Sequence, residues 1–475
     1  MSKPKKGLLR GKTGPSKIRL AAFLLIFAVV GGVILLVSHA TPNPNLQGDL
    51  NGDNTVNITD LSILLSNYGT TNTAADINSD GIVNVLDLSI LLSHYGQSIT
   101  GGGGGTTATL TCGWGTFNTL PLSMPTDCWR PFADNSWLNT PLPANPQLTS
   151  DSAAMINNLF CSTSPCPAGG DGTARIDAYN ATPYFESPVY FACSKISPRC
   201  NHVDPAYQIN CTGARIGCQD ENGVSTQGQI IYLPCGAQQA TGSDGQLDVF
   251  DQDLGTDWSL NAITTVLPTS NCPAGPTVIS GRFAAKFSYN GQGRAACSDA
   301  ACVSGEAGQL RAPELVAGHI DHALGVVTRS CNGGNAYPGY SANSPSCGGV
   351  NSLAAANGQW FYLDLTDSDI AALNVKDWQK TILTALSHYG FFVKDQGSNG
   401  AFEIQTEGPG TYYSGSDAWF AWANSEVAKY GSASAAGLGW SGSGQLSFNF
   451  DTGLGPAFWR AHAHVVAACV IQKTC

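Results

Sequence analysis

The sequence predicts a mainly β chain with inserted helices, a disulfide-rich β-sandwich or jelly roll, which follows a hydrophobic N-terminal helix and a small all-α module. Three observations carry this prediction. Short segments rich in β-branched and aromatic residues recur after residue 188, all 16 cysteines lie between Cys112 and Cys475, and a 12-residue loop followed by the same helix occurs twice before residue 97. Many short strands and turns with few helices favour sheets that pack on one another.

Residues 1–40 are predicted to be a signal peptide or a transmembrane signal anchor. Residues 1–19 hold seven basic residues and no acidic one, and residues 20–37 (LAAFLLIFAVVGGVILLV) carry no charge. This stretch is long for the core of a signal peptide and just long enough to cross a bilayer. Small residues at 38–40 suit a signal peptidase, so both alternatives stay open. Both place the rest of the chain outside the cell, either secreted or anchored to the cell membrane.

Two loops carry the oxygen-bearing residues that calcium needs. Residues 49–60 read DLNGDNTVNITD and residues 76–87 read DINSDGIVNVLD, with Asp or Asn at loop positions 1, 3, 5, 9 and 12. Calcium takes roughly six to eight oxygen ligands, and this spacing wraps them around one point, with a backbone carbonyl from position 7. The predicted ligands of two Ca2+ ions are Asp49, Asn51, Asp53, Thr55, Asn57 and Asp60 in the first loop, and Asp76, Asn78, Asp80, Ile82, Asn84 and Asp87 in the second.

The same helix follows each loop, with DLSILLSNYG at 60–69 and DLSILLSHYG at 87–96. This repeated loop–helix unit, with Asp at loop position 12, resembles a type I dockerin over residues 48–96. The resemblance implies a cellulosome-like role, in which the module binds a cohesin domain and attaches a secreted protein, mostly a polysaccharide-degrading enzyme, to a scaffold or surface. The residues expected to face the cohesin are Ile58, Thr59, Val85 and Leu86. The alternative is a calcium-stiffened spacer without a partner.

The charge balance bears on the partners of the chain. The chain has 23 basic and 34 acidic residues, a net charge of −11, and without the seven N-terminal basic residues 16 basic residues remain against 34 acidic ones, a net charge of −18. Such a chain repels phosphate backbones, so nucleic acid is not expected as a partner.

The glycine run 101–105 predicts a flexible linker over residues 97–107, between the repeat module and a disulfide-rich extracellular β domain over residues 108–475. The even cysteine count and the predicted export favour up to eight disulfides. Close pairs indicate local staples at Cys161/Cys166, Cys193/Cys200, Cys211/Cys218 and Cys297/Cys302, and Cys469 and Cys475 are expected to pair locally or to pin the tail. Zinc is the disfavoured alternative, because no CxxC pair occurs.

Strands and two helices are expected in the large domain. The strand segments are 189–194, 229–235, 246–252, 277–291, 359–365, 391–395 and 401–405. The helices are 312–324 (APELVAGHIDHAL), with proline near its start, and 367–389, where Asp367 and Ser368 cap the beginning and Gly390 ends it.

Four segments of the large domain resemble an uncharacterised family of secreted bacterial proteins. They are residues 130–159, 242–260, 311–324 and 362–395, which include GSDGQLDVFDQDLGTDWSL and RAPELVAGHIDHAL. Gln252 departs from the pattern, which has proline there, and residues 331–347 resemble an insertion. This resemblance implies no particular reaction.

The candidate catalytic residues are carboxyl groups and one histidine. Glycoside hydrolysis needs two carboxyl groups beside one bond, one protonated and one ionised. The candidates are Asp251, which with Asp244 brackets a strand, Glu314 and His322 on the predicted helix 312–324, and Asp395 after a strand. The alternatives are a turn-forming role for each aspartate and a structural role for the histidine.

The function expected from these residues and from the dockerin resemblance is hydrolysis of O-glycosyl bonds in extracellular polysaccharide by a cohesin-docked enzyme, with a lyase less favoured. The alternative is a non-catalytic carbohydrate-binding protein or a cell-surface adhesion or assembly protein. Residues 411–424 (TYYSGSDAWFAWAN) are expected to form an aromatic lip facing the substrate, with core packing as the alternative. His462 and His464 would share one face of a strand as metal ligands, but the spacing identifies no third ligand.

Overall fold

The computed structural model describes residues 48–51, 56, 58–78, 81–93, 130–161, 172–180, 187–197, 200, 202–213, 215–251, 253–272, 275–329, 331–340, 351–398, 400–408 and 417–475. The chain divides into two units, Met1–Thr111 and Cys112–Cys475. The expected N-terminal hydrophobic helix and the glycine linker lie outside the described residues. Within the described ranges, no helix has the length and apolar character needed to cross a membrane.

The first unit contains two helices related by the sequence repeat. Helix α2 spans Ile58–Ser66 and helix α3 spans Val85–Ser93, 27 residues further along the chain. Backbone hydrogen bonds join the end of the first repeat to the second loop, from Gly69 to Val83 and from Val83 to Thr70. The small shared core consists of Leu50, Val56, Leu64, Ala75, Val83 and Leu91. Because equivalent positions of both repeats supply this core, each repeat buries the apolar face of the other.

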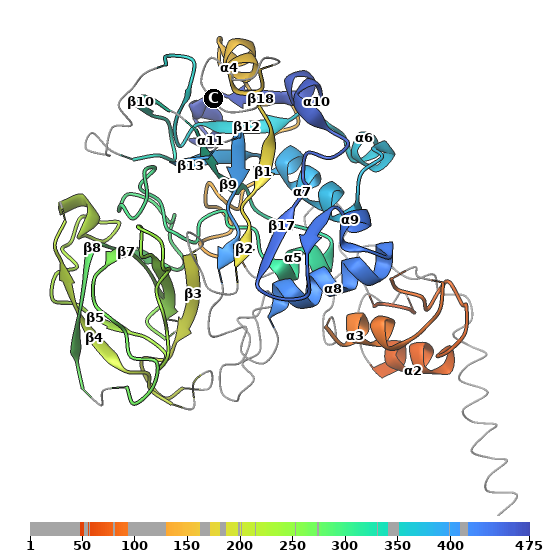
Figure 1. Ribbon diagram of the computed structural model, residues 1–475, viewed down its shortest axis with the longest axis horizontal. Coiled ribbons are helices and arrows are strands. Elements are labelled where there is room, and N and C mark those ends of the chain that lie inside the picture. The colour runs from red at the N-terminus through yellow and green to blue at the C-terminus, as the bar shows by residue number, and fades with distance from the viewer. Residues whose placement is uncertain are drawn as a thin grey trace, which may run out of the picture. The chain divides into compact units, whose positions relative to one another are not determined.

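The second unit contains a strongly curved seven-stranded sheet (Figure 1). Its order is β15 (Glu407–Gly408), β3 (Ser187–Ala192), β6 (Leu247–Asp251), β7 (Thr256–Ile263), β8 (Thr277–Ser288), β4 (Ala206–Cys211) and β5 (Ile230–Tyr232). The pairs β15–β3, β3–β6 and β4–β8 are parallel, and the remaining pairs are antiparallel. Gly255, at φ 64°, makes the tight turn from β6 to β7. A separate core that includes Tyr190, Val249 and Trp258 lies within this sheet.

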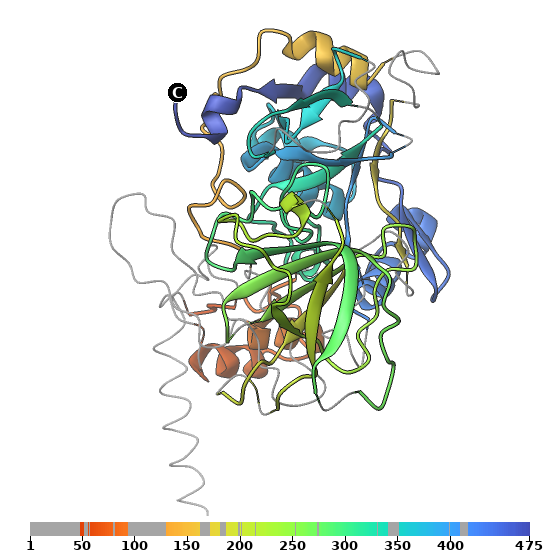
Figure 2. The same ribbon diagram turned by 90° about the vertical axis from the view of Figure 1, so that its left-hand side faces the viewer.

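A six-stranded sheet with helices packed against it forms the other half of this unit. Its order is β1 (Ala174–Ile176), β14 (Phe402–Ile404), β9 (Leu324–Thr328), β13 (Phe391–Gln396), β12 (Trp360–Leu363) and β18 (Ala463–Val466). Helix α4 (Ser152–Leu159) packs on β18, and α7 (Asp377–His388) packs on β12. The blue and cyan half in Figure 2 is this sheet with its helices, and the green half is the seven-stranded sheet. The large aromatic-rich core around this sheet and its helices includes Phe160, Trp378 and Trp459, and it extends to Phe191 and Phe250 of the seven-stranded sheet.

Shorter elements complete the unit. Two small sheets pair β10 (Cys331–Asn335) with β11 (Ala355–Asn357), and β16 (Leu438–Trp440) with β17 (Gln445–Phe448) and β2 (Tyr179–Asn180). The remaining helices are η1 (Arg215–Gly217), α5 (Ala312–Ala317), α6 (Asp367–Ala372), α8 (Ala418–Tyr430), α9 (Ala433–Ala436), α10 (Gly455–His462) and α11 (Ala468–Ile471).

The expected mainly β fold with helices and several disulfides is confirmed, and each of the seven expected strand segments contains an observed strand. The finer expectation of a β-sandwich or jelly roll differs from the structure, because both large sheets mix parallel and antiparallel pairs and helices pack on the six-stranded sheet. Two expected helices are also corrected. The helix expected at 312–324 ends at Ala317, because Gly318 adopts a left-handed φ of 78°, and the helix expected at 367–389 is split into α6 and α7. Thr366, rather than Asp367 or Ser368, caps α6.

Five described disulfides staple the second unit. Cys193–Cys200, Cys211–Cys218, Cys297–Cys302 and Cys469–Cys475 confirm the expected local pairs, and Cys235–Cys272 closes a longer loop of 37 residues. Cys166, the expected partner of Cys161, lies outside the described residues. No described cysteine is free, which leaves their sulfur atoms unavailable to zinc.

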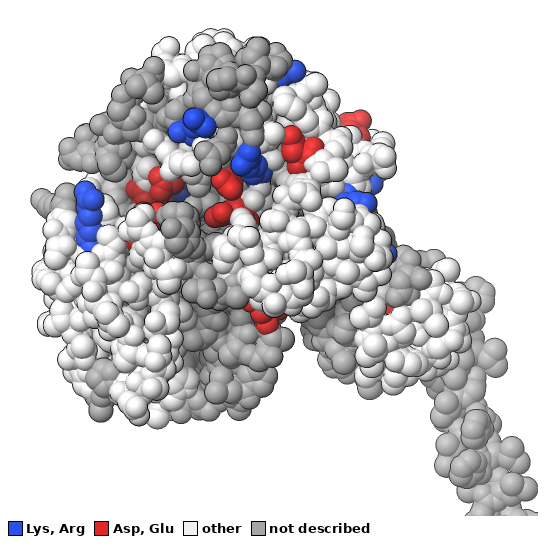
Figure 3. Space-filling model, viewed as in Figure 1, with Lys and Arg blue, Asp and Glu red and all other residues white. Residues whose placement is uncertain are grey.

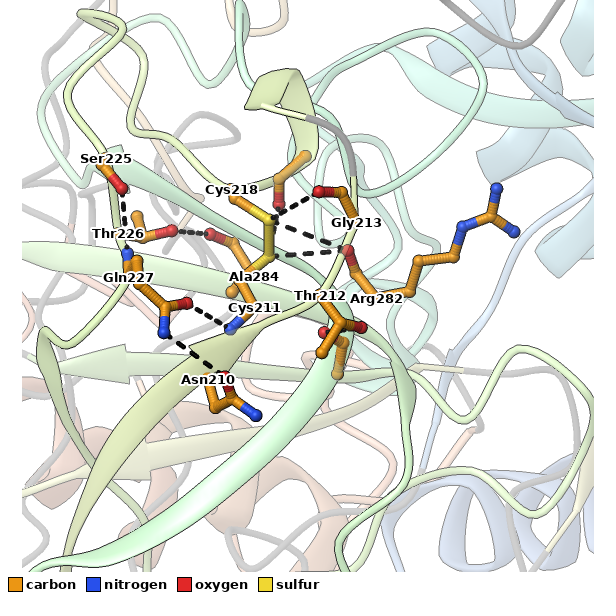
Figure 4. The surroundings of a disulfide bond; sticks show 12 residues. Asn210, Cys211, Thr212, Gly213, Cys218, Ser225, Thr226, Gln227, Arg282 and Ala284 are labelled. Carbon is orange, nitrogen blue, oxygen red and sulfur yellow. Dashed lines mark hydrogen bonds between the residues drawn. A yellow bond between two sulfur atoms is a disulfide. The ribbon is translucent and has the colours of Figure 1, made fainter.

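The Cys211–Cys218 disulfide fixes the backbone of β8 at Arg282 (Figure 4). Its two sulfur atoms lie 3.5 and 3.9 Å from the carbonyl oxygen of Arg282. A Cβ atom on Gly213 would lie 2.0 Å from the same oxygen, so only glycine fits between the staple and the strand. The side chain of Arg282 points away from the disulfide.

Candidate functional site

The two predicted calcium loops close in the same way. Asp60 is fully buried, and its Oδ1 accepts hydrogen bonds from the backbone amides of Leu50 (2.8 Å) and Asn51 (3.1 Å). Asp87 repeats this with the amides of Ile77 (2.7 Å) and Asn78 (3.1 Å). The last aspartate of each loop therefore binds the backbone at the start of its own loop and holds the two ends of the loop together.

The donor set of these loops fits a hard cation. The described members are Asp49, Asn51 and Asp60 in the first loop and Asp76, Asn78, Ile82, Asn84 and Asp87 in the second, whereas Asp53, Thr55, Asn57 and Asp80 lie outside the described residues. Asp49 and Asp76 are buried beside Asp60 and Asp87, and buried carboxylates at this density need a compensating cation. Calcium would supply that charge to the oxygens of these residues, and the donor set suits its preference for oxygen ligands.

An acidic cleft of about 500 Å³ lies between the two large sheets of the second unit. Its walls come from β6 and β7 of the seven-stranded sheet, from β13 and β14 of the six-stranded sheet, and from the loop around Asp299. The carboxyl groups that line it belong to Asp177, Asp244, Asp248, Asp299, Asp395 and Glu403. In Figure 3, acidic side chains gather where the visible face of this unit is hollowed.

A β-bulge places two consecutive residues of β13 in the cleft. Neighbouring residues of a regular strand point to opposite faces, yet Lys394 and Asp395 both line the cleft. The register of β13 against β9 shifts between Val393 and Asp395, which makes Lys394 the extra residue of the bulge. Asp395 and Glu403 both pair with Val327 of β9, so they lie in one row across three strands.

Asp395 is the carboxyl group whose acidity is best suited to proton transfer. Burial, and to a smaller extent the negative charge of Asp244, raise the pKa of Asp395 to about 6, against the hydrogen bond from the Gln396 amide and the charge of Lys394. Asp244 lies on the exposed loop before β6 and also lines the cleft. The cleft therefore contains one carboxyl group that is protonated in mild acid and a second, solvated carboxylate that acts on it electrostatically.

A buried polar network supports the floor of the cleft. Asp248 accepts a hydrogen bond from Ser187, and Asp257 accepts one from Ser304 at 2.5 Å. Burial raises the pKa of Asp248, and burial together with the charge of Asp248 raises that of Asp257 well above its ordinary value. Because these two carboxyl groups lie on neighbouring strands, the negative charge of one opposes the ionisation of the other.

Gly305 joins this network to Lys394. The Lys394 ammonium is 3 % exposed and donates to the carbonyl oxygen of Gly305, whose amide donates to Ser259 at 2.8 Å. A Cβ atom on Gly305 would lie 2.4 Å from Oδ1 of Asp248. The carboxyl group of Asp248 thus rests on a glycine because no larger residue fits there.

Of the four sequence-predicted catalytic residues, only Asp395 lines the cleft. Asp251 is buried at the end of β6, where its Oδ1 accepts from the amides of Asp253 (3.0 Å) and Leu254 (2.9 Å) and from Ser194 (3.0 Å). This is a turn-forming arrangement, and burial raises the pKa of Asp251. Its position gives it no contact with the cleft.

Glu314 and His322 form a buried ionic cluster with Arg311. Glu314 Oε1 lies 2.6 Å from Nη2 of Arg311 and 2.8 Å from Nε2 of His322. Burial opposes the charge of Glu314, but Arg311 and His322 outweigh it and hold its pKa at about 2. All three side chains are at most 3 % exposed and do not line the cleft, so the cluster joins α5 to the start of β9. The expectation that Glu314 and His322 lie on one helix is wrong, because the helix ends at Ala317.

The aromatic lip expected at 411–424 is also corrected where it is described. Trp419 and Trp422 lie on α8 and are 0 and 2 % exposed, with Phe448 packed against both. Residues 411–416 lie outside the described residues. The structure also gives His462 and His464 a common carboxylate partner, because Asp364 accepts from His462 Nδ1 at 3.0 Å and from His464 Nε2 at 2.9 Å.

Sequence reasoning missed Asp248, Asp299, Lys394 and Glu403 as cleft residues. Asp248 lies in the acidic segment 242–260, between the apolar residues Leu247 and Val249 of β6. A charged residue inside a buried strand is uncommon, and this pattern could have identified Asp248 as a candidate functional residue. The other three carry no local signal, because long-range pairing brings them together.

Comparison with known proteins assigns the first unit. Residues 47–94 match the family model described as Dockerin type I domain. A solved structure, the type II cohesin-dockerin domain from Bacteroides cellolosolvens, matches at 39% identity over 12% of this chain and 93% of that chain, with a TM-score of 0.12. No curated protein matches the chain. The chain therefore carries a type I dockerin domain, a calcium-binding module, over residues 47–94.

Proposed function

We propose that the protein is an extracellular component of a cellulosome-like assembly that docks to a cohesin domain and hydrolyses O-glycosyl bonds of polysaccharide. The dockerin match supports the docking step. The apolar residues Val85 and Leu86 are 61 and 54 % exposed at the start of α3, where the cohesin is expected, and an apolar patch of this kind favours a protein partner. Each of the two loops holds one Ca2+ ion, and calcium keeps α2 and α3 in place for docking.

The observation that carries the catalytic part is the pairing of Asp395 and Asp244 in one cleft. Asp395 acts as the general acid that protonates the leaving oxygen, because its pKa of about 6 keeps it protonated in mild acid. Asp244 acts as the ionised partner that activates water or attacks the sugar. Asp251, Glu314 and His322 have structural roles in this proposal.

A screen of the full chain against plant, fungal and bacterial polysaccharides tests this function, with new reducing ends and unsaturated products as the readouts. We expect reducing ends without unsaturated products. Asp395→Asn and Asp244→Asn should each lower kcat/KM by roughly 100-fold or more. Asp151→Asn is the matched control, because Asp151 is exposed before α4 and its side chain caps nothing.

Two outcomes contradict the catalytic proposal. Retention on a glycan without cleavage would move the protein to the class of carbohydrate-binding or adhesion proteins. Cleavage that survives both substitutions would remove Asp395 and Asp244 and leave Glu403, which lies in the same row, as the next carboxylate to change.

Docking is tested separately by calorimetry with a cohesin domain. We expect binding with calcium and none with a chelator. Val85→Asp should weaken it, and Val266→Asp, at a residue 89 % exposed in the second unit, should not.

A further inference from the structure

The buried side-chain atoms without a hydrogen-bond partner in the described lining of the cleft are all oxygens. Among the described lining residues, four buried side-chain oxygens have no hydrogen-bond partner: Asp248 Oδ1, Asp299 Oδ2, Gln309 Oε1 and Gln405 Oε1. Asp248 and Gln309 are 1 and 3 % exposed. Buried acceptors without donors are costly, so a ligand that supplies N–H groups would relieve them.

The charges on the walls of the cleft also favour a ligand that donates hydrogen bonds. Six carboxyl residues line the cleft against two cations, Arg282 and Lys394. Burial raises the pKa of Asp248, Asp299 and Asp395, whereas Asp177, Asp244 and Glu403 complete the acidic lining. Lys394 is buried, donates to Gly305, and its charge acts on Asp248, Asp299 and Asp395. Arg282 is exposed, and its guanidinium lies 5.3 Å from the centre of the Phe283 ring. The cleft therefore favours a cation and opposes an anion.

A protonated primary amine matches both observations. An ammonium group has three donors and no acceptor, whereas an amide or hydroxyl brings an acceptor that would face the cleft oxygens. A uronate would bring another negative charge to the carboxylates of the walls. Among sugars, a 2-amino-2-deoxy unit with a free amine carries the required group.

We propose that the cleft binds glycans with free, protonated amino groups, and that it selects them over N-acetylated and uronic acid polymers. This inference rests on the proposed function for the choice of a glycan, and it adds the substrate class. The four unpartnered oxygens would accept from the N–H groups of the amine and from the O–H groups of neighbouring hydroxyls.

Calorimetry on the full chain tests the inference without turnover. The probes are a glucosamine hexamer, the matched N-acetylglucosamine hexamer and an oligogalacturonide of the same length, at pH 5.5 and low salt. We expect the glucosamine hexamer to bind at least tenfold more tightly than the N-acetylated one, the oligogalacturonide not to bind, and added salt to weaken the glucosamine complex.

Two variants connect the binding to the cleft. Asp299→Asn and the milder Gln405→Leu should each weaken the glucosamine hexamer at least fivefold, while Asp151→Asn leaves it unchanged. Equal affinity for the glucosamine and N-acetylglucosamine hexamers, or oligogalacturonide binding, would overturn the inference. So would a lysine hexapeptide that binds as tightly as the glucosamine hexamer, because the cleft would then recognise ammonium groups without the sugar.

The amine preference and the proposed hydrolase function can be refuted independently of each other. Cleavage of a neutral glycan without glucosamine binding would refute the amine preference and leave the hydrolase standing. Tight glucosamine binding without cleavage of any glycan would refute the hydrolase and leave the amine site standing.

Discussion

Replacing Asp395 by asparagine should make the second unit more stable at alkaline pH and leave it almost unchanged in acid. Asparagine has nearly the same shape as aspartate and keeps the oxygen that accepts from the Gln396 amide at 2.8 Å, but it never ionises. The difference in stability between the variant and the wild type therefore measures how much the negative charge on Asp395 destabilises the folded state.

The size and sign of the effect follow from the pKa. The pKa of Asp395 is about 6 in the folded chain against 3.8 for an ordinary aspartate. Between these values the folded state binds more protons than the unfolded state, so its stability falls as the pH rises through this window. Above pH 6 the ionised Asp395 lowers the free energy of unfolding by its full amount, at most about 3 kcal/mol for a pKa difference of about two. Below pH 3.8 both forms of the protein are neutral at this position.

Urea unfolding at pH 4 and pH 8, followed by tryptophan fluorescence, measures this. All ten tryptophans lie after residue 112, so the signal reports on the second unit alone. We expect the asparagine variant to exceed the wild type by up to about 3 kcal/mol at pH 8 and to match it near pH 4. Asp151→Asn should show no such pH dependence. An Asp395→Asn variant that is equally stable relative to the wild type at both pH values would refute the reasoning.

Further predictions concern other parts of the chain. Removal of calcium with a chelator should lower the helical circular dichroism signal and abolish cohesin binding while the tryptophan fluorescence stays constant; a fluorescence change would contradict the independence of the second unit. Glu314→Gln should cost about 3–5 kcal/mol in urea unfolding, because it leaves a buried arginine without its anion; a loss below 1 kcal/mol would contradict it. Trp419→Ala should cost about 3–5 kcal/mol and leave glycan retention of the folded fraction intact, since this side chain is buried in the core; a selective loss of retention would contradict it. Gly305→Ala should lower glycan cleavage at least tenfold, because its Cβ displaces Asp248, and unchanged activity would show that the position of this carboxyl group does not matter.

The features that the sequence predicts well are those carried by short stretches of chain. The repeat places α2 and α3 27 residues apart, as the DLSILLS copies require. Strands appear where β-branched and aromatic residues cluster between turn residues. Four disulfides join the cysteines that are close in sequence, because a short loop limits which partner a cysteine reaches.

The helix expected at 312–324 fails for a tertiary reason. Its apolar spacing continues past Gly318, but the glycine takes the left-handed conformation and ends the helix. The chain then turns back, so that His322 reaches Glu314 eight residues earlier. In a sequence, a single glycine is compatible with a helix that continues and with a helix that ends there. In the folded chain the ionic cluster of Glu314, Arg311 and His322 favours a helix that ends at this glycine.

The cleft could be predicted only in part. Asp395 stands out as a carboxyl group after a strand, but the regular alternation of a strand would place Lys394 and Asp395 on opposite faces. The bulge that brings both into the cleft depends on pairing with β9, some 70 residues away, and leaves no local signature. Asp248 on β6 and Asp299 on a loop likewise come together only in the folded chain.

The two walls of the cleft are made at different times, and this affects what an incomplete chain does. Six strands of the seven-stranded sheet, with Asp244, Asp248 and three disulfides, come from the continuous segment 187–288. The charged residues of the opposite wall, Lys394, Asp395 and Glu403, follow only after residue 390. A chain emerges and folds from its N-terminus, so the dockerin and the first wall are complete before the cleft exists. A protein cut short before residue 391 would occupy a cohesin without any active cleft, and it would act as a competitor of the full-length protein on the scaffold.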